Sequence, residues 1–212
     1  MMLLLAAVLL VLLNAFFVIA EFSLVKIRRT RLEELVKQDN KRAALALKIV
    51  DSFDTYLGAT QLGITLSSLA LGWIGEPAVS FLLKPLFEAY FPNVPWFLTL
   101  ASVASGFTVI TFLHIVLGEL VPKSMAIQRA EPLALFVAWP LYIFHKLGYP
   151  VIALFHLTAR VILRMMGLKA TSETELAHSE DELRLIVSAS HRGGVLDQME
   201  SEIIDNVFDF AD

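Results

Sequence analysis

The chain has 212 residues, 57% of them hydrophobic, and carries a formal net charge of −4. Soluble domains contain roughly 45–50% apolar residues, so this composition excludes an ordinary soluble protein and predicts a membrane protein. We expect an all-α membrane protein. The chain contains no cysteine, which excludes disulfides and thiolate metal sites.

The first predicted element is a transmembrane helix over residues 1–25. An uninterrupted apolar run of this length can cross a bilayer. Positive charge follows the run and does not precede it, so a cleaved signal peptide is not expected. The same charge pattern places the N-terminus outside and the basic residues from Lys26 onward in the cytoplasm.

The middle of the chain is predicted to contain one cytoplasmic helix and two further spans. Residues 30–52 interleave apolar and charged residues, so one face of a helix can lie on the membrane surface. A second span is predicted over residues 56–83, and a third over residues 96–121. Residues 84–95 between them are predicted to form an external loop, because prolines interrupt the segment and it has almost no positive charge.

Residues 132–168 are apolar enough to suggest a fourth span. Pro140, Gly148 and Pro150 are predicted to divide them into two pieces of roughly a dozen residues, which are too short to cross. We therefore expect three transmembrane helices plus a cytoplasmic juxtamembrane helix–turn–helix belt. Together these elements would form a transmembrane domain over residues 1–170.

Residues 171–212 are predicted to be a soluble, cytoplasmic helical linker. Residues 179–182 match a capping box, and the helix that follows is expected to stop at residues 191–194. Another short helix is expected over residues 200–210. The chain ends at Asp212 without a natural-looking terminus, so we expect it to be the first part of a longer protein.

A carboxylate in the third span is the strongest sign of function, because ionisable groups in membrane segments are rare and by default suggest a functional site. Glu119 follows Gly118, and Pro122 cannot donate a hydrogen bond to the Gly118 carbonyl. In lipid that carbonyl needs a partner, which can be protein, water or a cation. Oxygen ligands of this kind favour a hard cation such as magnesium or calcium. The alternative is structural, an ion pair between Glu119 and Lys123.

The second span carries a stripe of small and polar residues. Steps of three and four residues keep them on one helical face, which can pack closely against another helix or ligate an ion. The stripe consists of Gly58, Gln61, Thr65, Ser68 and Gly72.

Three polar residues in the first span are also candidates. Asn14 and Glu21 are seven residues apart and share a face of a regular helix, whereas Ser23 points elsewhere unless the helix is broken. Glu21 has an alternative role as an ion-pair partner of the basic residues that follow it. In the third span, His114 can serve either as a proton-linked group or as a hydrogen-bonding residue of the bundle.

Three motifs resemble the CorC branch of the CNNM/CorC family of membrane proteins. They are residues 14–23 followed by 28–35, residues 61–69, and residues 118–124. Residues 182–210 resemble the link to the paired CBS domains, which bind ATP and magnesium in full-length members of the family. The resemblance covers nearly the whole chain and implies a homodimeric magnesium transporter of the DUF21 type in the inner (plasma) membrane. It further implies export of magnesium, with sodium as a coupling ion.

The resemblance also implies an ion site between the three spans, at a kinked first helix and the Gly-Glu-x-x-Pro turn. A break near Ala20 would be needed to aim Ser23 inward. The site carried over in this way consists of Ser23, Ser68, the Gly118 carbonyl and Glu119, with Thr65, Glu21 and Asn14 as weaker candidates.

Other functions are weighed against transport. The same site could serve a magnesium sensor that binds the ion without passing it. A pore-forming, membrane-damaging protein is disfavoured, because the spans are few and no amphipathic pore-lining segment is evident. An enzyme is not expected, since no nucleophile–base pair or cofactor motif is found. Nucleic-acid binding is not expected either, because the basic cluster adjoins a membrane span.

Overall fold

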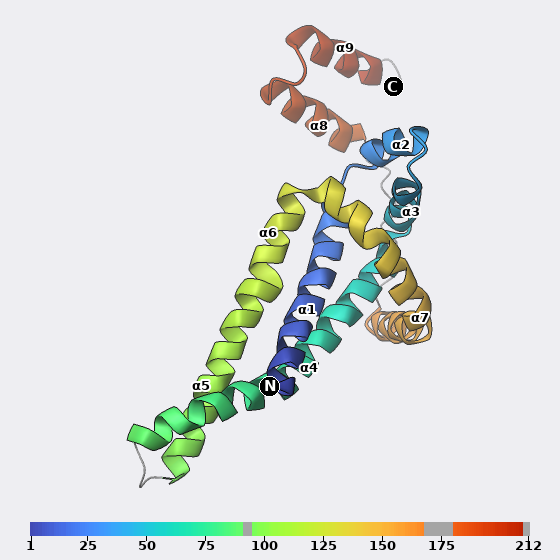
Figure 1. The fold of residues 1–212 in the computed structure, drawn as a ribbon. Helices are drawn as coiled ribbons and strands as arrows, with labels where there is room; N and C mark the ends of the chain where they lie inside the picture. Colours follow the sequence, from blue (N-terminus) through green and yellow to red (C-terminus); the bar gives the residue numbers. More distant parts are fainter. Residues whose placement is uncertain (91–94, 168–179, 210–212) are drawn as a thin grey trace. The chain divides into compact units, whose positions relative to one another are not determined.

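A computed structural model describes residues 1–90, 95–167 and 180–209 of the chain (Figure 1). The regular structure in these ranges is entirely helical, with no strand among the described residues. The predicted all-α class is therefore confirmed. The residues separate into two compact units, Met1–Met165 and Met166–Asp212.

Four helices in the described part of the chain are long and apolar enough to cross a membrane, one more than the sequence predicts. Figure 1 shows α1 between α4 and the long helix that contains α5 and α6. The four are α1 (Met2–Lys26), α4 (Phe53–Tyr90), the continuous helix formed by α5 (Pro95–Leu113), η1 (His114–Leu120) and α6 (Val121–Gln128), and α7 (Ala130–Met165).

Helix α7 corrects the prediction that residues 132–168 form two short pieces. Pro140 and Pro150 both lie inside the one helix, and Figure 1 shows the helix bent. A proline removes one backbone hydrogen bond and kinks a helix, but packing on both sides can hold the helix together. Val137 before Pro140 and Ile152 after Pro150 are buried in the same apolar cluster.

The predicted single helix over residues 30–52 is also corrected, because it is two helices, α2 (Arg29–Lys37) and α3 (Lys41–Val50). Asp39 has a φ of 63°, a left-handed conformation that Asp and Asn tolerate better than most residues. Asn40 then caps α3, since its side-chain oxygen accepts hydrogen bonds from the backbone N–H groups of Arg42 (3.0 Å) and Ala43 (3.2 Å). This is the side-chain chemistry that starts a helix.

The predicted external loop over residues 84–95 is shorter than expected, because α4 continues through Pro85 to Tyr90. The rest of the loop, residues 91–94, lies outside the described residues. Helices α4 and α5 then pack closely where Gly106 faces Ser80. A Cβ on Gly106 would lie 2.4 Å from the Ser80 hydroxyl, so glycine is what allows the approach. The Ser80 hydroxyl donates to the Ser102 carbonyl across this contact, at 2.9 Å.

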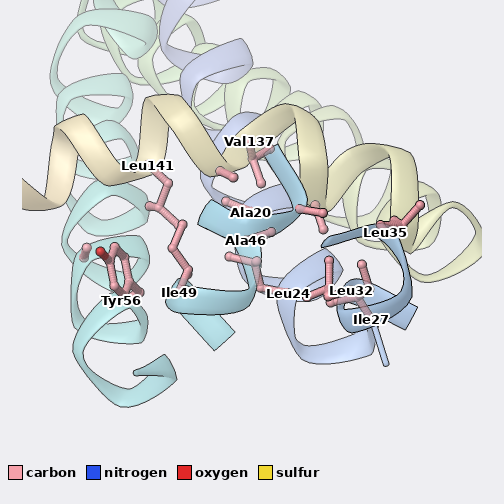
Figure 2. Close-up of a cluster of buried hydrophobic side chains, with 14 of the residues drawn as sticks. Ala20, Leu24, Ile27, Leu32, Leu35, Ala46, Ile49, Tyr56, Val137 and Leu141 are labelled. Atoms are coloured by element: carbon pink, nitrogen blue, oxygen red, sulfur yellow. The ribbon is translucent and has the colours of Figure 1, made fainter. Parts of the chain in front are cut away.

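An apolar cluster, here called the basic-end core, ties the end of α1 to α2, α3, the start of α4 and α7 (Figure 2). Leu32, Ile49 and Leu141 are fully buried in it, and burying each such side chain stabilises the fold by about 1.5–3 kcal/mol. Its other buried members are Ala20, Leu24, Ile27, Leu35, Ala43, Ala46, Tyr56, Ala59, Ala134, Val137, Ala138 and Ile152.

An ion pair at the surface joins α2 to the first turn of α7. The Nε atom of Arg31 lies 2.9 Å from a carboxylate oxygen of Glu131, and its Nη1 atom lies 2.7 Å from Glu34. The hydrogen bonds that Arg31 donates to the carboxylates of Glu131 and Glu34 raise the pKa of its guanidinium. The pair links α2 to the start of α7 and adds little stability, because exposed ion pairs contribute little.

The second unit contains α8 (Glu180–Arg192) and α9 (Gln198–Asp209). A capping box starts α9: the Asp197 side chain accepts from the Glu200 N–H (2.7 Å), and the Glu200 side chain accepts from the Asp197 N–H (2.9 Å). The capping box predicted at residues 179–182 begins outside the described residues. The predicted domain boundary at 170/171 and the chain end at 210–212 also lie outside them.

The basic-end core leads to a stability prediction. Ile49→Ala should lower the free energy of unfolding by about 2–5 kcal/mol, because a fully buried side chain is removed and a cavity is left. Leu12→Ala is the matched control, since Leu12 is 60% exposed. Thermal unfolding of the purified chain in detergent would measure both variants. An equal loss for the two would contradict the assignment of this cluster as a core.

Candidate functional site

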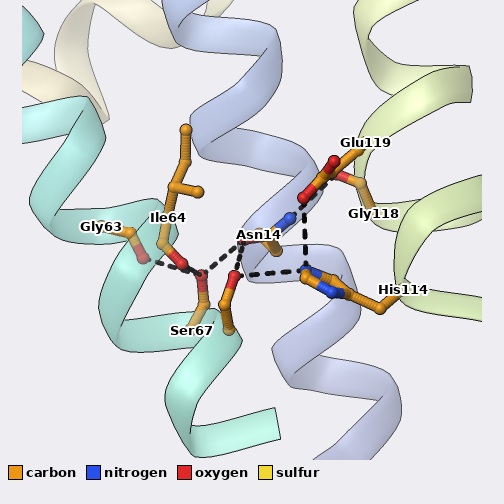
Figure 3. Close-up of polar contacts among 8 residues, drawn as sticks. Asn14, Gly63, Ile64, Ser67, His114, Gly118 and Glu119 are labelled. Atoms are coloured by element: carbon orange, nitrogen blue, oxygen red, sulfur yellow. Dashed lines mark hydrogen bonds and ion pairs between the residues drawn. The ribbon is translucent and has the colours of Figure 1, made fainter. Parts of the chain in front are cut away.

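The candidate site is built around Asn14, which lies in the middle of α1 and is completely buried. Its Nδ2 donates to the Gly118 carbonyl at 3.0 Å, and its Oδ1 accepts from the hydroxyls of Ser67 (3.0 Å) and Ser68 (3.1 Å) (Figure 3). Gly118 belongs to η1 and the two serines belong to α4. One amide therefore links three membrane-grade helices.

His114 and Glu119 extend this network on the side of η1. The Ser68 hydroxyl lies 3.2 Å from Nε2 of His114, and that nitrogen lies 3.9 Å from a carboxylate oxygen of Glu119. The Glu119 side chain is 47% exposed and that of His114 is 18% exposed. The carboxylate is thus the most accessible charged group of the network.

The local backbone explains why these two side chains meet. Residues His114–Leu120 form a π-helix, in which residues five apart are paired by the backbone. His114 and Glu119 are five apart, so the wider turn places them together. The π-helix ends where α6 begins with Pro122 in its first turn. Helical irregularities of this kind are frequent at functional sites.

Gly118 is required at its position for steric reasons. A Cβ there would lie 2.9 Å from Cδ2 of His114 and 3.2 Å from Nδ2 of Asn14. The carbonyl of Gly118, which the sequence predicts to need a partner, finds one in the Asn14 amide. The ion-pair alternative for Glu119 is not what the structure shows. Lys123 instead places its ammonium 4.4 Å from the centroid of the Phe22 ring.

Ser23 is not brought into this network. Helix α1 is unbroken from Met2 to Lys26, so the break near Ala20 that would turn Ser23 inward does not occur. Ser23 is buried, and its hydroxyl donates to the carbonyl of Ala20 in its own helix at 3.4 Å. Ion binding by Ser23 therefore stays a prediction drawn from the family resemblance alone.

Glu21 lies on α1 seven residues beyond Asn14 and is partly buried. The groups that interact with its carboxylate are the Thr60 hydroxyl of α4 and the ammonium of Lys123. It is a separate acidic position nearer the basic end of the bundle. Seven residues of helix correspond to about 10 Å along the axis.

The residues of the polar stripe of α4 do not all face the same neighbouring helix. Ser68 faces α1 through Asn14, whereas Thr65 and Gln61 are exposed and line a cavity of about 460 Å³ between α4 and α7. Gly58 packs against His156 of α7, and Gly72 has open space beside it. The stripe is divided because α1 and α7 cover different sides of the same helix.

Ser67 belongs to this hydrogen-bond network although the sequence analysis does not name it, and Asn14, a weaker candidate there, lies at the centre of the network. Asn14 is the only amide or charged residue among the first 20 residues. An isolated amide in an apolar helix must be hydrogen-bonded to another helix, which was the available signal. Nothing in the sequence separates Ser67 from Ser68, because only the helix orientation decides which hydroxyls reach Asn14.

The network offers mainly oxygen ligands with a single full charge, together with the imidazole nitrogen of His114. Asn14, Ser67, Ser68 and the Gly118 carbonyl supply neutral oxygens, and Glu119 supplies the carboxylate. No cluster of three or more His, Cys, Asp or Glu residues occurs among the described residues. The donor set suits a hard cation that keeps part of its water shell rather than a transition metal.

Comparison with known proteins gives consistent matches along the chain. The family model described as the cyclin M transmembrane N-terminal domain, CNNM, matches residues 5–200. The UPF0053 protein YhdT of Bacillus subtilis (strain 168) is 45% identical over 202 residues, which cover 95% of this chain and 43% of that protein. The UPF0053 protein YhdP of the same organism is 44% identical, with coverages of 96% and 46%. The UPF0053 protein sll0260 of Synechocystis sp. is 33% identical, and the match covers 96% of this chain and 45% of that protein.

The Asn14 network leads to a second stability prediction. Asn14→Leu should lower the free energy of unfolding by about 1–3 kcal/mol, because it leaves the buried Gly118 carbonyl without its partner. Ser67→Ala should lower the free energy of unfolding by a smaller amount. Its hydroxyl also donates to the Gly63 and Ile64 carbonyls of its own helix, and those carbonyls keep their helical bonds. Denaturation in mixed micelles would compare the two, and a larger loss for Ser67→Ala would contradict the central role of Asn14.

Proposed function

Because the chain belongs to the CNNM family of membrane domains, we propose that it is the membrane part of a magnesium transporter. The observation that carries the proposal is the meeting of oxygen ligands from α1, α4 and η1 around the Asn14 amide. A carboxylate at the edge of this network gives a cation a charged point of entry. The chain spans less than half the length of the Bacillus relatives it matches, so the activity of the whole protein is part of the proposal.

Magnesium would replace some of the hydrogen bonds of the network with metal–ligand bonds. Each serine hydroxyl and the Asn14 Oδ1 has a lone pair that can bind the ion. The Gly118 carbonyl would become available if the Asn14 amide turned away. With only Glu119 charged, the ion would keep several water molecules, as magnesium usually does in proteins. Ser23 would join only if the end of α1 changed conformation.

The direction and coupling of transport follow from the family resemblance. We infer magnesium export by alternating access in a homodimer, with a sodium gradient as the driving force. Glu21, between the site and the basic end of the bundle, would offer a second carboxylate on the cytoplasmic side of the path. The alternative function is a magnesium sensor, which would bind the ion at the same network without moving it.

We also infer that the chain lies in the plasma membrane with the N-terminus outside. The basic residues of α2 and α3 would then face the cytoplasm. The C-terminal residues would be cytoplasmic as well, which requires α7 to stay on that side although its length suffices to cross. The early turns of α7 and Ile152 in its second half both pack in the basic-end core, and this packing supports the arrangement.

The site proposal predicts that Glu119→Gln weakens magnesium binding by at least tenfold, because the only full charge of the ligand set is lost. Glu76→Gln is the matched control. Glu76 is another carboxylate in a candidate span and accepts a hydrogen bond from Ser80 at 2.6 Å. Calorimetry on the purified chain would measure binding, and magnesium flux in liposomes would separate transporter from sensor. Unchanged binding in Glu119→Gln would refute the site.

The proposed orientation can be tested by cysteine labelling, because the chain contains no cysteine of its own. We expect Glu88→Cys, at the end of α4 away from α3, to react with an impermeant maleimide on intact cells. Lys37→Cys and Arg192→Cys should react only after the membrane is permeabilised. Labelling of Arg192→Cys from outside would instead show that α7 crosses the membrane.

A further inference from the structure

A second cavity, with charged and polar side chains in its lining, lies at the basic end of the first unit, away from the Asn14 network. It has a volume of about 380 Å³ and is lined by Lys48 of α3, Tyr56 of α4, and Tyr142, His145, Lys146 and Tyr149 of α7. Its volume is within the range of small-molecule sites. Three elements thus bring two ammonium groups, three phenols and an imidazole to one place.

The charges of this cavity are uncompensated. Neither Lys48 nor Lys146 forms an ion pair with any residue that the structure describes, and no carboxylate lines the cavity. The nearby Asp51 is occupied by Arg29, at 3.0 Å. Two cations without counter-charges around a cavity favour an anionic ligand.

Packed aromatic rings form the wall of the cavity. The His145 ring lies tilted against Tyr56 at a centroid distance of 4.4 Å and makes an edge contact with Tyr149 at 5.9 Å. Tyr56 is 5% exposed and belongs to the basic-end core beside Ile49 (Figure 2). The Nε2 atom of His145 is buried and has no hydrogen-bond partner in the described part of the chain. Because this nitrogen is closed to solvent, the contacts to a ligand would come from the exposed Lys48, Lys146 and Tyr149 side chains.

The surroundings indicate where the ligand comes from. Leu147, next to Lys146, is 78% exposed, and Ile143 is 47% exposed. Both lie on α7, a helix apolar enough for a membrane, so lipid chains would contact this surface. Tyrosine and lysine are typical of the headgroup level, and basic pockets between helices on the cytoplasmic side bind anionic headgroups.

We propose that this cavity binds the phosphate group of an anionic phospholipid. Lys48 and Lys146 would contact the phosphate oxygens, the tyrosine hydroxyls would donate to it, and the acyl chains would lie along the exposed face of α7. A bound headgroup would join the end of α3 to the middle of α7 through charge. The site shares no residue with the Asn14 network and so does not depend on magnesium binding, whereas its place on the cytoplasmic side rests on the proposed orientation.

The test compares two pairs of lysines of equal charge. Native mass spectrometry of the purified chain in detergent would follow binding of phosphatidylglycerol, with phosphatidylcholine as the neutral reference. We expect the double variant Lys48→Gln/Lys146→Gln to weaken phosphatidylglycerol binding at least tenfold. The control, Lys37→Gln/Lys41→Gln, removes the same charge from α2 and α3 outside the cavity and should change binding less than twofold. The thermal midpoint of each variant would verify folding.

Further arms separate the possible sources of phosphate. Inorganic phosphate at millimolar concentration should not displace the lipid, because it lacks the acyl chains that contact α7. Equal loss in both lysine pairs would show general attraction of a basic surface and overturn the proposal. Equal binding of phosphatidylcholine and phosphatidylglycerol would overturn it, as would displacement by inorganic phosphate. Retained binding in Lys48→Arg/Lys146→Arg is expected, since the charge remains.

Discussion

The arrangement of the first unit depends on the need to satisfy one buried amide in a medium without water. Asn14 lies in a helix that is otherwise apolar, and both ends of its side chain are hydrogen-bonded to other helices. In lipid, such a group costs several kcal/mol when it is left unpaired. Association of α1 with α4 and η1 at this one level therefore sets the register of the three helices, which apolar packing alone would leave less defined.

The π-helix is the second constraint, and it lies at the same contact. A regular α-helix would place Glu119 farther from His114, whereas the widened turn pairs residues five apart. Gly118 at the centre of the turn allows the Asn14 side chain to reach the backbone. The carbonyl that Pro122 leaves without its α-helical donor is thus used by α1. A group that accepts a hydrogen bond from an amide can also accept a cation, which links this local geometry to the proposed transport.

The basic-end core packs the end of the bundle on the side where positive charges gather. Helices α2 and α3 form a short pair because Asp39 and Asn40 reverse the chain and cap the second helix. Their apolar faces, together with α7, cover the end of α1 and the start of α4. A movement of α1 at the level of Asn14 would therefore also displace α2, α3 and α7. The candidate phospholipid cavity lies against the same core, through Tyr56.

The sequence alone determined the helical class, the first three membrane-grade segments, the family resemblance and the local backbone chemistry of Gly118 and Pro122. These features depend on local composition, hydropathy and the backbone chemistry of proline, which act within a few residues. The tertiary structure decided what depends on helix orientation. It selected Asn14 and Ser67 for the network, left Ser23 on the other side of an unbroken α1, and divided the α4 stripe between two neighbours. It also made residues 130–165 one helix, because packing on both sides of two prolines outweighed their tendency to end it.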